Sequence, residues 1–178
     1  MVFINGKKKI CILGLGYIGL PTAAMFATHG HKIVGVDINQ KIVDALNEGK
    51  ITIYEPYLDI LVHAAVTSGN LRGSTQPEEA DAFIISVPTP ITEEKAADMS
   101  YVEIAAESIV PYLRPGNLVI LESTSPPGTV KNLLVPILEK SGLKIGTELL
   151  VAHCPERVLP GKILIELVEN PRIIGGIN

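Results

Sequence analysis

The sequence lacks tryptophan, has only two cysteines and contains no long uninterrupted apolar run. Two cysteines cannot build a disulfide framework, and they give no metal-binding pattern, so no metal is expected. No apolar stretch reaches the roughly 18 residues that a membrane-crossing helix needs. The opening Met1-Val2-Phe3-Ile4-Asn5 is too short for the apolar core of a secretion signal. These absences predict a cytosolic protein.

A basic cluster is also missing. The 15 Lys and Arg residues against 19 Asp and Glu residues give a net charge of -4, which argues against nucleic acid or an anionic membrane as the main partner. No repeat, low-complexity tract or long linker interrupts the 178 residues. The 47% hydrophobic content suits an aliphatic α/β core, so we expect a single domain over residues 1–178.

The most informative segment is an apolar run, Ile10-Cys11-Ile12-Leu13, that leads directly into Gly14-Leu15-Gly16-Tyr17-Ile18-Gly19. Three glycines at this spacing, between a strand and a helix, are typical of a loop that holds the pyrophosphate of a dinucleotide. Gly14 would allow the tight turn, Gly16 the close approach of the pyrophosphate, and Gly19 the close packing of the helix. The amino end of that helix favours an anion.

A second apolar run ends at Asp37, about twenty residues further on, where dinucleotide-binding domains place a ribose-binding acid. Its carboxylate would accept hydrogen bonds from the adenosine ribose hydroxyls. It would also repel a ribose 2′-phosphate, by up to ~4 kcal/mol at about 4 Å and an effective dielectric constant near 20. We therefore expect NAD, and not NADP, as the cofactor.

Apolar runs and helical spacing alternate along the chain, which predicts a doubly wound, mainly parallel α/β sheet of the Rossmann type. We expect Asn39 to cap a helix, and Ser100 with Glu103 to form a capping box. The expected strands are 9–13, 32–37, 82–87, 118–122, 149–153 and 172–175, with a weaker strand at 70–74. The expected helices are 18–28, 39–47, 101–113 and 127–140.

Several polar side chains follow the predicted strands, at the edge where open α/β sheets bind ligands. Thr89 and Thr124 are each equally compatible with a turn or cap and with a ligand contact. Glu55 is likewise either a cap or a contact. Glu156 beside Arg157 could form a surface ion pair of little energetic value, but its place at a strand end favours a functional role.

Eight short motifs along the chain form a recognisable set. They are Gly14-Leu15-Gly16-Tyr17-Ile18-Gly19-Leu20-Pro21, Gly35-Val36-Asp37-Ile38-Asn39, Tyr54-Glu55-Pro56, Pro88-Thr89-Pro90, Glu122-Ser123-Thr124, Pro126-Pro127-Gly128-Thr129, Cys154-Pro155-Glu156-Arg157-Val158-Leu159-Pro160-Gly161 and Glu169-Asn170-Pro171-Arg172-Ile173-Ile174-Gly175-Gly176. Together these motifs resemble the UDP-glucose/GDP-mannose dehydrogenase family. The last two are similar to the branch that acts on UDP-N-acetylmannosamine, and Pro160 stands where glucose-type relatives carry a second acid.

The resemblance implies roles for individual residues. Glu156 would assist proton transfer or water activation, Thr124 would act beside it in the catalytic site, and Arg157 and Val158 would contact the sugar nucleotide. The residues implied to contact NAD are Tyr17, Ile18, Asp37, Thr89 and Thr124. The implied reaction takes the C6 alcohol of a UDP-sugar to a carboxylate with two NAD molecules.

Family members carry the covalent step on a thiol in a region that would follow Asn178, together with a central helix and a substrate domain. We therefore expect the 178-residue chain to bind NAD but not to complete the oxidation. Cys154 is not expected to replace that thiol, because the nearby Glu156 disfavours a thiolate. Cys11 reads as a small core residue. The resemblance implies a homodimer for the complete protein and leaves the state of this segment open.

Three alternative functions remain open on the sequence alone. The first is a UDP-glucose 6-dehydrogenase. The second is an NAD-dependent dehydrogenase of the β-hydroxyacid or 6-phosphogluconate type, which shares the glycine loop but gives no reason for the motif 155–161. The third is a non-catalytic module that binds NAD to report redox state and needs no carboxylate at the sheet edge.

Overall fold

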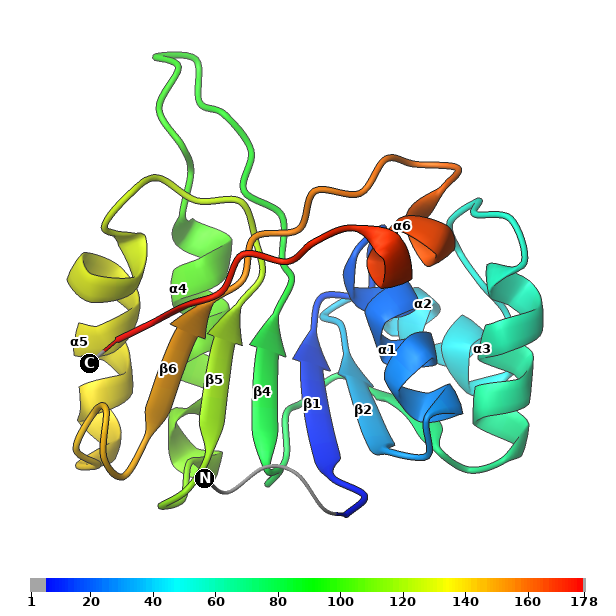
Figure 1. Cartoon of the computed structure of the whole chain (residues 1–178), viewed down its shortest axis with the longest axis horizontal. Helices are drawn as coiled ribbons and strands as arrows, with labels where there is room; N and C mark the ends of the chain where they lie inside the picture. The colour runs from blue at the N-terminus through cyan, green and yellow to red at the C-terminus, as the bar shows by residue number, and fades with distance from the viewer. Residues whose placement is uncertain (1–5, 178) are drawn as a thin grey trace.

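A computed structural model describes residues 6–177, and it shows a seven-stranded sheet with helices on both faces (Figure 1). The strands are β1 (Lys9–Leu13), β2 (Lys32–Val36), β3 (Leu71–Ser74), β4 (Ala82–Ile85), β5 (Leu118–Leu121), β6 (Leu150–His153) and β7 (Gly175–Gly176). Their order is β3-β2-β1-β4-β5-β6-β7, with the first six parallel and β7 antiparallel to β6. The opening segment 1–5 lies outside the described residues.

The helices divide between the two faces as a doubly wound sheet requires. The helices are α1 (Gly19–Thr28), α2 (Gln40–Asn47), α3 (Leu58–Thr67), α4 (Ser100–Ile109), α5 (Val135–Leu138) and α6 (Ile163–Glu169), with a π-helical turn at Val130–Leu134 and short 3₁₀ turns at Val110–Tyr112 and Glu139–Ser141. Side chains from α1, α2 and α3 pack into one core, and those from α4 and α5 into the other. The winding direction therefore changes between β1 and β4.

Alternate residues of β1 enter opposite cores, which is why this strand is apolar throughout. Ile10 and Ile12 pack with α1 and α3, whereas Cys11 and Leu13 pack with α4 and α5. Burial raises the pKa of the Cys11 thiol to about 12, so this cysteine is a core residue, as predicted from its strand position.

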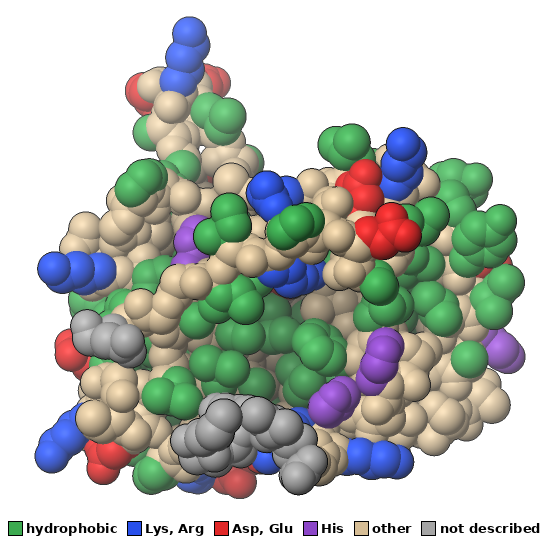
Figure 2. Space-filling model, viewed as in Figure 1, with side chains coloured by type: hydrophobic (Ala, Val, Ile, Leu, Met, Phe, Trp, Pro, Cys, Tyr) green, Lys and Arg blue, Asp and Glu red, His purple; other side chains and the backbone are tan. Residues whose placement is uncertain are grey.

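Only one face of the β4–β6 half is fully covered. Ile120, Leu118 and Leu150 remain partly exposed on the face opposite α4 and α5. Figure 2 shows apolar side chains gathered there, beneath the C-terminal segment that crosses the sheet. Within residues 6–177, no helix combines the length and apolar character that crossing a bilayer demands.

Most of the predicted elements are confirmed, including the weaker strand β3 and the cap at Asn39, whose side chain accepts a hydrogen bond from the Lys41 N–H at 3.0 Å. The last strand exists, but its predicted bounds were wrong: of the run 172–175 only Gly175 lies in β7, and Arg172 lies in irregular backbone. The capping box was also wrong, because Ser100 is the first residue of α4 and Asp98 accepts its N–H. Asp98, two residues upstream, thus accepts the Ser100 N–H that the Glu103 side chain would accept in a capping box.

Two helices, α3 and α6, were not predicted. Helix α6 has only seven residues, too few for a clear apolar period. Helix α3 begins after Tyr57, whose φ of 65° is left-handed. The helix predicted at 127–140 does form, but it is irregular. Pro136 lies within it and lacks the N–H that a regular α-helical turn would use.

The strand register aligns the carboxyl ends of five parallel strands at one edge of the sheet. Leu13 pairs with both Val36 and Ile85, Ile85 pairs with Leu121, and Leu121 pairs with His153. The residues that directly follow this row are Gly14, Asp37, Ser86, Glu122 and Cys154. Residues far apart in the sequence are thereby brought to one edge.

Candidate functional site

The glycine loop after β1 is packed so closely that two of its glycines admit no side chain. Gly14 has a φ of +92°, and a Cβ there would lie 2.6 Å from the Ser86 carbonyl oxygen at the end of β4. A Cβ on Gly19 would lie 1.8 Å from the Gly14 carbonyl oxygen. Gly19 is therefore required by the loop itself as well as by helix packing.

Gly16 differs from both, because nothing lies within 4 Å of the position that its Cβ would take. The fold places no demand on this glycine, so the open space above it is free for a ligand. The loop leads into α1, which has no acidic side chain in its first turn. The positive end of the helix is thus not neutralised by its own sequence.

Asp37 fastens the glycine loop to the end of β2. Its Oδ2 accepts the Leu15 N–H at 3.0 Å, and its Oδ1 accepts the Asn39 N–H at 2.9 Å. Each carboxylate oxygen can accept more than one hydrogen bond, so ribose hydroxyls can still be bound. Tyr17, with 47% of its surface exposed, stands on the same loop beside the half-buried Ile18.

Thr89 and Thr124 lie on adjacent loops after β4 and β5. The Ser123 hydroxyl donates to the Val87 carbonyl oxygen at 2.7 Å and so joins the two loops. Thr89 is half-buried, and Thr124 is exposed. The structure thus brings both threonines to the edge that carries the glycine loop.

An ionic cluster with two buried carboxylates and a partly exposed guanidinium occupies the other half of this edge. Its centre is Arg172, which donates from one guanidinium nitrogen to Glu122 Oε1 at 3.3 Å and from the other to Glu156 Oε2. The side chains of Glu122 and Glu156 are only 3% and 7% exposed. Ser86 donates to Glu122 Oε2 at 2.7 Å. The cluster thus joins the ends of β4, β5 and β6 to the segment before β7.

Glu156 and Arg157 do not form the surface ion pair that sequence proximity allowed. Glu156 Oε1 accepts the backbone N–H of Arg157 at 2.8 Å, and its ion-pair partner is Arg172. The Arg157 guanidinium instead donates to the Pro171 carbonyl oxygen at 2.5 Å. Val158 is half-buried on the same loop.

Burial dominates the electrostatics of this cluster. Desolvation raises the pKa of Glu122 above its ordinary value, although the Ser86 hydrogen bond and the Arg172 charge oppose the rise. Burial by itself would lower the pKa of Arg172, but Cys154 and the two carboxylates outweigh it, and the pKa is raised. The guanidinium therefore remains charged.

Glu55 supports the loop that carries Arg157 and Val158. Its buried carboxylate accepts the N–H groups of Gly161 and Ile163, both at 2.7 Å. The sequence allowed either a cap or a contact for this residue. The structure shows a cap, on a helix more than a hundred positions away in the chain.

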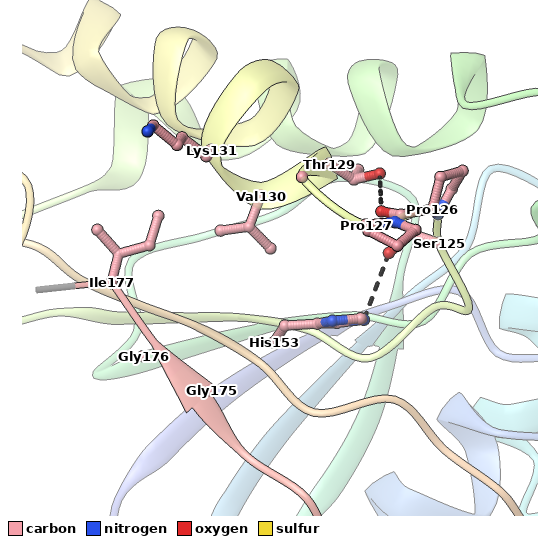
Figure 3. Close-up of a pocket in the computed structure, with 11 residues that line it drawn as sticks. Ser125, Pro126, Pro127, Thr129, Val130, Lys131, His153, Gly175, Gly176 and Ile177 are labelled. Atoms are coloured by element: carbon pink, nitrogen blue, oxygen red, sulfur yellow. Dashed lines mark hydrogen bonds between the residues drawn. The ribbon is translucent and has the colours of Figure 1, made fainter.

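Two cavities border the ends of β5 and β6. One, of about 390 Å³, lies between the amino end of the π-helical turn and β7, where His153 faces Ser125 with 3.3 Å between the ring Nε2 and the hydroxyl oxygen (Figure 3). The other, of about 450 Å³, lies between α1, α6 and the segment before β7 and reaches Glu122 and Arg172. Among residues 6–177, no group of three or more His, Cys, Asp or Glu side chains is arranged to hold a metal ion.

Sequence reasoning missed Glu122 and Arg172 as members of the site. Glu122 follows the apolar strand Leu118–Leu121 directly, and a charged residue at such a strand end is a detectable signal. The sequence around Arg172 gave no comparable signal, because its two partners, Glu122 and Glu156, lie 50 and 16 positions away in the chain.

The raised pKa of Glu122 gives a pH-dependent prediction for Glu122→Gln. Because the folded state holds the proton more tightly than the unfolded state, the wild-type chain gains stability below the ordinary pKa of about 4.3 and loses it as pH rises through the folded pKa. Glutamine does not ionise. The free energy of unfolding of the variant, relative to that of wild type, should therefore be higher at about pH 8 than at about pH 5. Urea titration at the two pH values measures this difference.

Glu79→Gln is the matched control, because it removes only the exposed ion pair with Arg114. Its effect should stay below about 1 kcal/mol at both pH values. A stability difference between Glu122→Gln and wild type that is the same at both pH values would contradict the prediction.

Comparison with known proteins agrees with this geometry. Residues 8–178 match the profile of the UDP-glucose/GDP-mannose dehydrogenase family, NAD binding domain. The chain is 53% identical over 182 residues to the UDP-N-acetyl-D-mannosamine dehydrogenase of Campylobacter jejuni, covering 98% of this chain and 45% of that protein. It is 54% identical over 177 residues to the NDP-N-acetyl-D-galactosaminuronic acid dehydrogenase of Ralstonia solanacearum, covering 96% and 42%.

A solved structure gives the same result. The UDP-N-acetyl-mannosamine dehydrogenase of Staphylococcus aureus matches with a TM-score of 0.92 and 50% identity, over 96% of this chain and 42% of that one. The chain thus spans less than half the length of the relatives it matches. It belongs to the UDP-glucose/GDP-mannose dehydrogenase family, as the NAD-binding domain of that family.

Proposed function

We propose that this chain binds NAD and forms one wall of the active site of a dehydrogenase that oxidises C6 of UDP-N-acetyl-D-mannosamine to the carboxylate. The observation that carries the proposal is the shared edge of the sheet, which carries both the glycine loop with Asp37 and the carboxylate of Glu156. An NAD-sensing module would have no need of that carboxylate. A dehydrogenase of the β-hydroxyacid type is not favoured by the family match.

The cofactor fits the residues present. The open space at Gly16, the amino end of α1 and the Asp37 carboxylate form a continuous surface for a pyrophosphate and its adenosine ribose. Tyr17, Ile18, Thr89 and Thr124 would contact the remainder of NAD, as the family resemblance implies. Bound NAD would accept the hydride from the sugar.

The roles on the substrate side rest on the ordered loop after β6. Glu156 would assist proton transfer or water activation, with Thr124 beside it, and Arg157 and Val158 would contact the sugar nucleotide. Their loop is fixed at both ends, by Arg172 on Glu156 and by Glu55 on Gly161. A site fixed in this way would present the groups in one orientation.

The choice of UDP-N-acetyl-D-mannosamine is supported by two features. Relatives named for that substrate are 53% and 50% identical to this chain over the parts that align. Pro160 also replaces the second acid of glucose-type relatives. The oxidation itself would need a thiol from another part of the complete protein, because Cys154 is only 5% exposed. The homodimeric state of the complete protein and the cytosolic location stay predictions.

Asp37→Ala should weaken NAD binding by about 1–3 kcal/mol, because a hydrogen-bonding carboxylate is lost from the ribose site. Isothermal titration calorimetry on the 178-residue chain measures the change. The wild-type chain should bind NAD more tightly than NADP, which provides a comparison without a variant. An unchanged affinity for NAD in Asp37→Ala would remove the role assigned to this residue.

The glycine loop provides a second test with a matched pair of variants. Gly16→Ala should leave the free energy of unfolding nearly unchanged, because its Cβ meets open space, yet it should weaken NAD binding by filling the pyrophosphate site. Gly19→Ala should destabilise the fold itself, because its Cβ would overlap the Gly14 carbonyl. Equal NAD affinity in Gly16→Ala and wild type would show that the pyrophosphate lies elsewhere.

The substrate is tested in the complete protein that contains this chain. With UDP-N-acetyl-D-mannosamine, two NADH should form per sugar, with a kcat/KM above that for UDP-glucose. The 178-residue chain alone should bind NAD without producing NADH. Equal efficiency with the two sugars would overturn the substrate assignment, and turnover by the chain alone would overturn the division of the active site.

A further inference from the structure

Arg172 is the residue on which the buried acids of the site converge. Its two terminal nitrogens reach Glu122 Oε1 at 3.3 Å and Glu156 Oε2, and the first also lies 3.7 Å from Cys154 Sγ. Glu122 follows β5, and Cys154 and Glu156 follow β6, whereas Arg172 comes from the segment between α6 and β7. The Arg172 side chain thus binds acids that follow two different strands, β5 and β6.

The contacts suit arginine better than lysine. The guanidinium presents donors in a planar fork, so one group can bind two carboxylates at once. A lysine ammonium is a single point of charge and would favour one partner over the other. Both carboxylates are almost fully buried, and a buried charge without a partner is costly. Arg172 therefore supplies the positive charge that both buried acids share.

The effect on Glu156 is to fix its orientation. One carboxylate oxygen accepts the Arg157 N–H at 2.8 Å, and the other accepts the Arg172 guanidinium. Both oxygens therefore have a partner that sets the direction of the carboxylate plane. A second hydrogen bond joins the same two segments, because the Arg157 guanidinium donates to the carbonyl oxygen of Pro171, the residue before Arg172. The loop after β6 and the segment before β7 are thus joined twice.

Glu122 acts in turn on Arg172. It directly follows β5, and Ser86, which directly follows β4, donates to its second oxygen at 2.7 Å. Its carboxylate is thereby held between a hydroxyl and the guanidinium. Because Glu122 is only 3% exposed, its position depends on the packed strands and not on solvent. It anchors one side of the guanidinium while the other side faces Glu156.

We propose that Arg172 is a positioning residue of the dehydrogenase site: anchored on Glu122, it sets the orientation of the Glu156 carboxylate. This inference rests on the proposed function, because it gives Glu156 a part in the chemistry. Arg172 would act through Glu156 and touch neither NAD nor the sugar. Its loss should therefore slow turnover without weakening the binding of NAD at the glycine loop on β1 and β2.

The test compares Arg172→Lys and Arg172→Met with wild type in the complete protein, with UDP-N-acetyl-D-mannosamine and NAD. We expect kcat to fall about 10- to 100-fold in Arg172→Met, because small displacements of a reacting group have effects of this size. The KM for NAD should stay within about twofold. Arg172→Lys should recover part of the loss, since it keeps the charge but not the fork.

A chemical rescue separates positioning from a general loss of structure. In Arg172→Ala, added guanidinium ion at millimolar concentration should restore part of kcat, and an equal concentration of sodium ion should not. Arg114→Met is the matched control: it breaks an exposed arginine–glutamate pair at the opposite end of the strands. Its kcat should equal that of wild type. The NAD affinity of each variant shows whether it has folded.

The outcomes distinguish the two proposals. If wild type oxidises the sugar and folded Arg172→Met does so at the same rate, the positioning role is overturned and the proposed function stands. The role is also overturned if Arg172→Met fails to fold and folded Arg172→Lys keeps the wild-type kcat. If wild type oxidises no UDP-sugar, the proposed function fails and the inference falls with it.

Discussion

The structure depends on the contact of two backbones at the point where the winding of the sheet reverses. The loop after β1 passes against the end of β4, and at Gly14 there is no room for even one additional carbon before the Ser86 carbonyl. The start of α1 then returns over the same loop at Gly19. Such close approach is possible only without side chains. It brings the amino end of α1 down to the sheet edge and leaves Gly16 at the open surface.

Buried and half-buried acids organise the rest of that edge, through backbone N–H groups or through a guanidinium. Asp37 binds backbone N–H groups of the glycine loop and of its own turn, and Glu55 binds two N–H groups at the start of α6. Glu122 and Glu156 share the Arg172 guanidinium. Buried carboxylates are tolerated only with such partners. Each acid consequently fixes the backbone or side chain that it binds, and loops become parts of a defined surface.

The sequence was most informative where structure depends on neighbouring residues. The glycine loop, the strand β1 before it and the helix α1 after it follow from local spacing, and the Asn39 cap depends on a residue two positions away. The local signal misled at Ser100, where Asp98 competes for the same backbone donor. Even there the error concerned the cap, and the helix itself was found.

Long-range partners could not be read from the sequence. Glu156 has an arginine as its immediate neighbour, and only the fold shows that the guanidinium bound to it is sixteen positions further on. Glu55 gave no hint that it caps α6, because the two are brought together by tertiary packing. Parallel strands impose this limit, since residues that meet at one edge are separated by whole crossover helices. Strand ends predict which residues share an edge but not which of them pair.

Ser86 connects the two halves of the edge. Its carbonyl oxygen bounds the space at Gly14, and its hydroxyl donates to Glu122, which binds Arg172, which in turn binds Glu156. The surface that receives the dinucleotide and the carboxylate assigned to proton transfer are therefore built on one continuous series of contacts. Ser86 and Glu122 directly follow β4 and β5, so the sheet sets the distance between the glycine loop and Glu122, and the ion pairs of Arg172 extend the series to Glu156. A flexible loop could not fix that distance, and hydride transfer between two bound molecules requires it to be fixed.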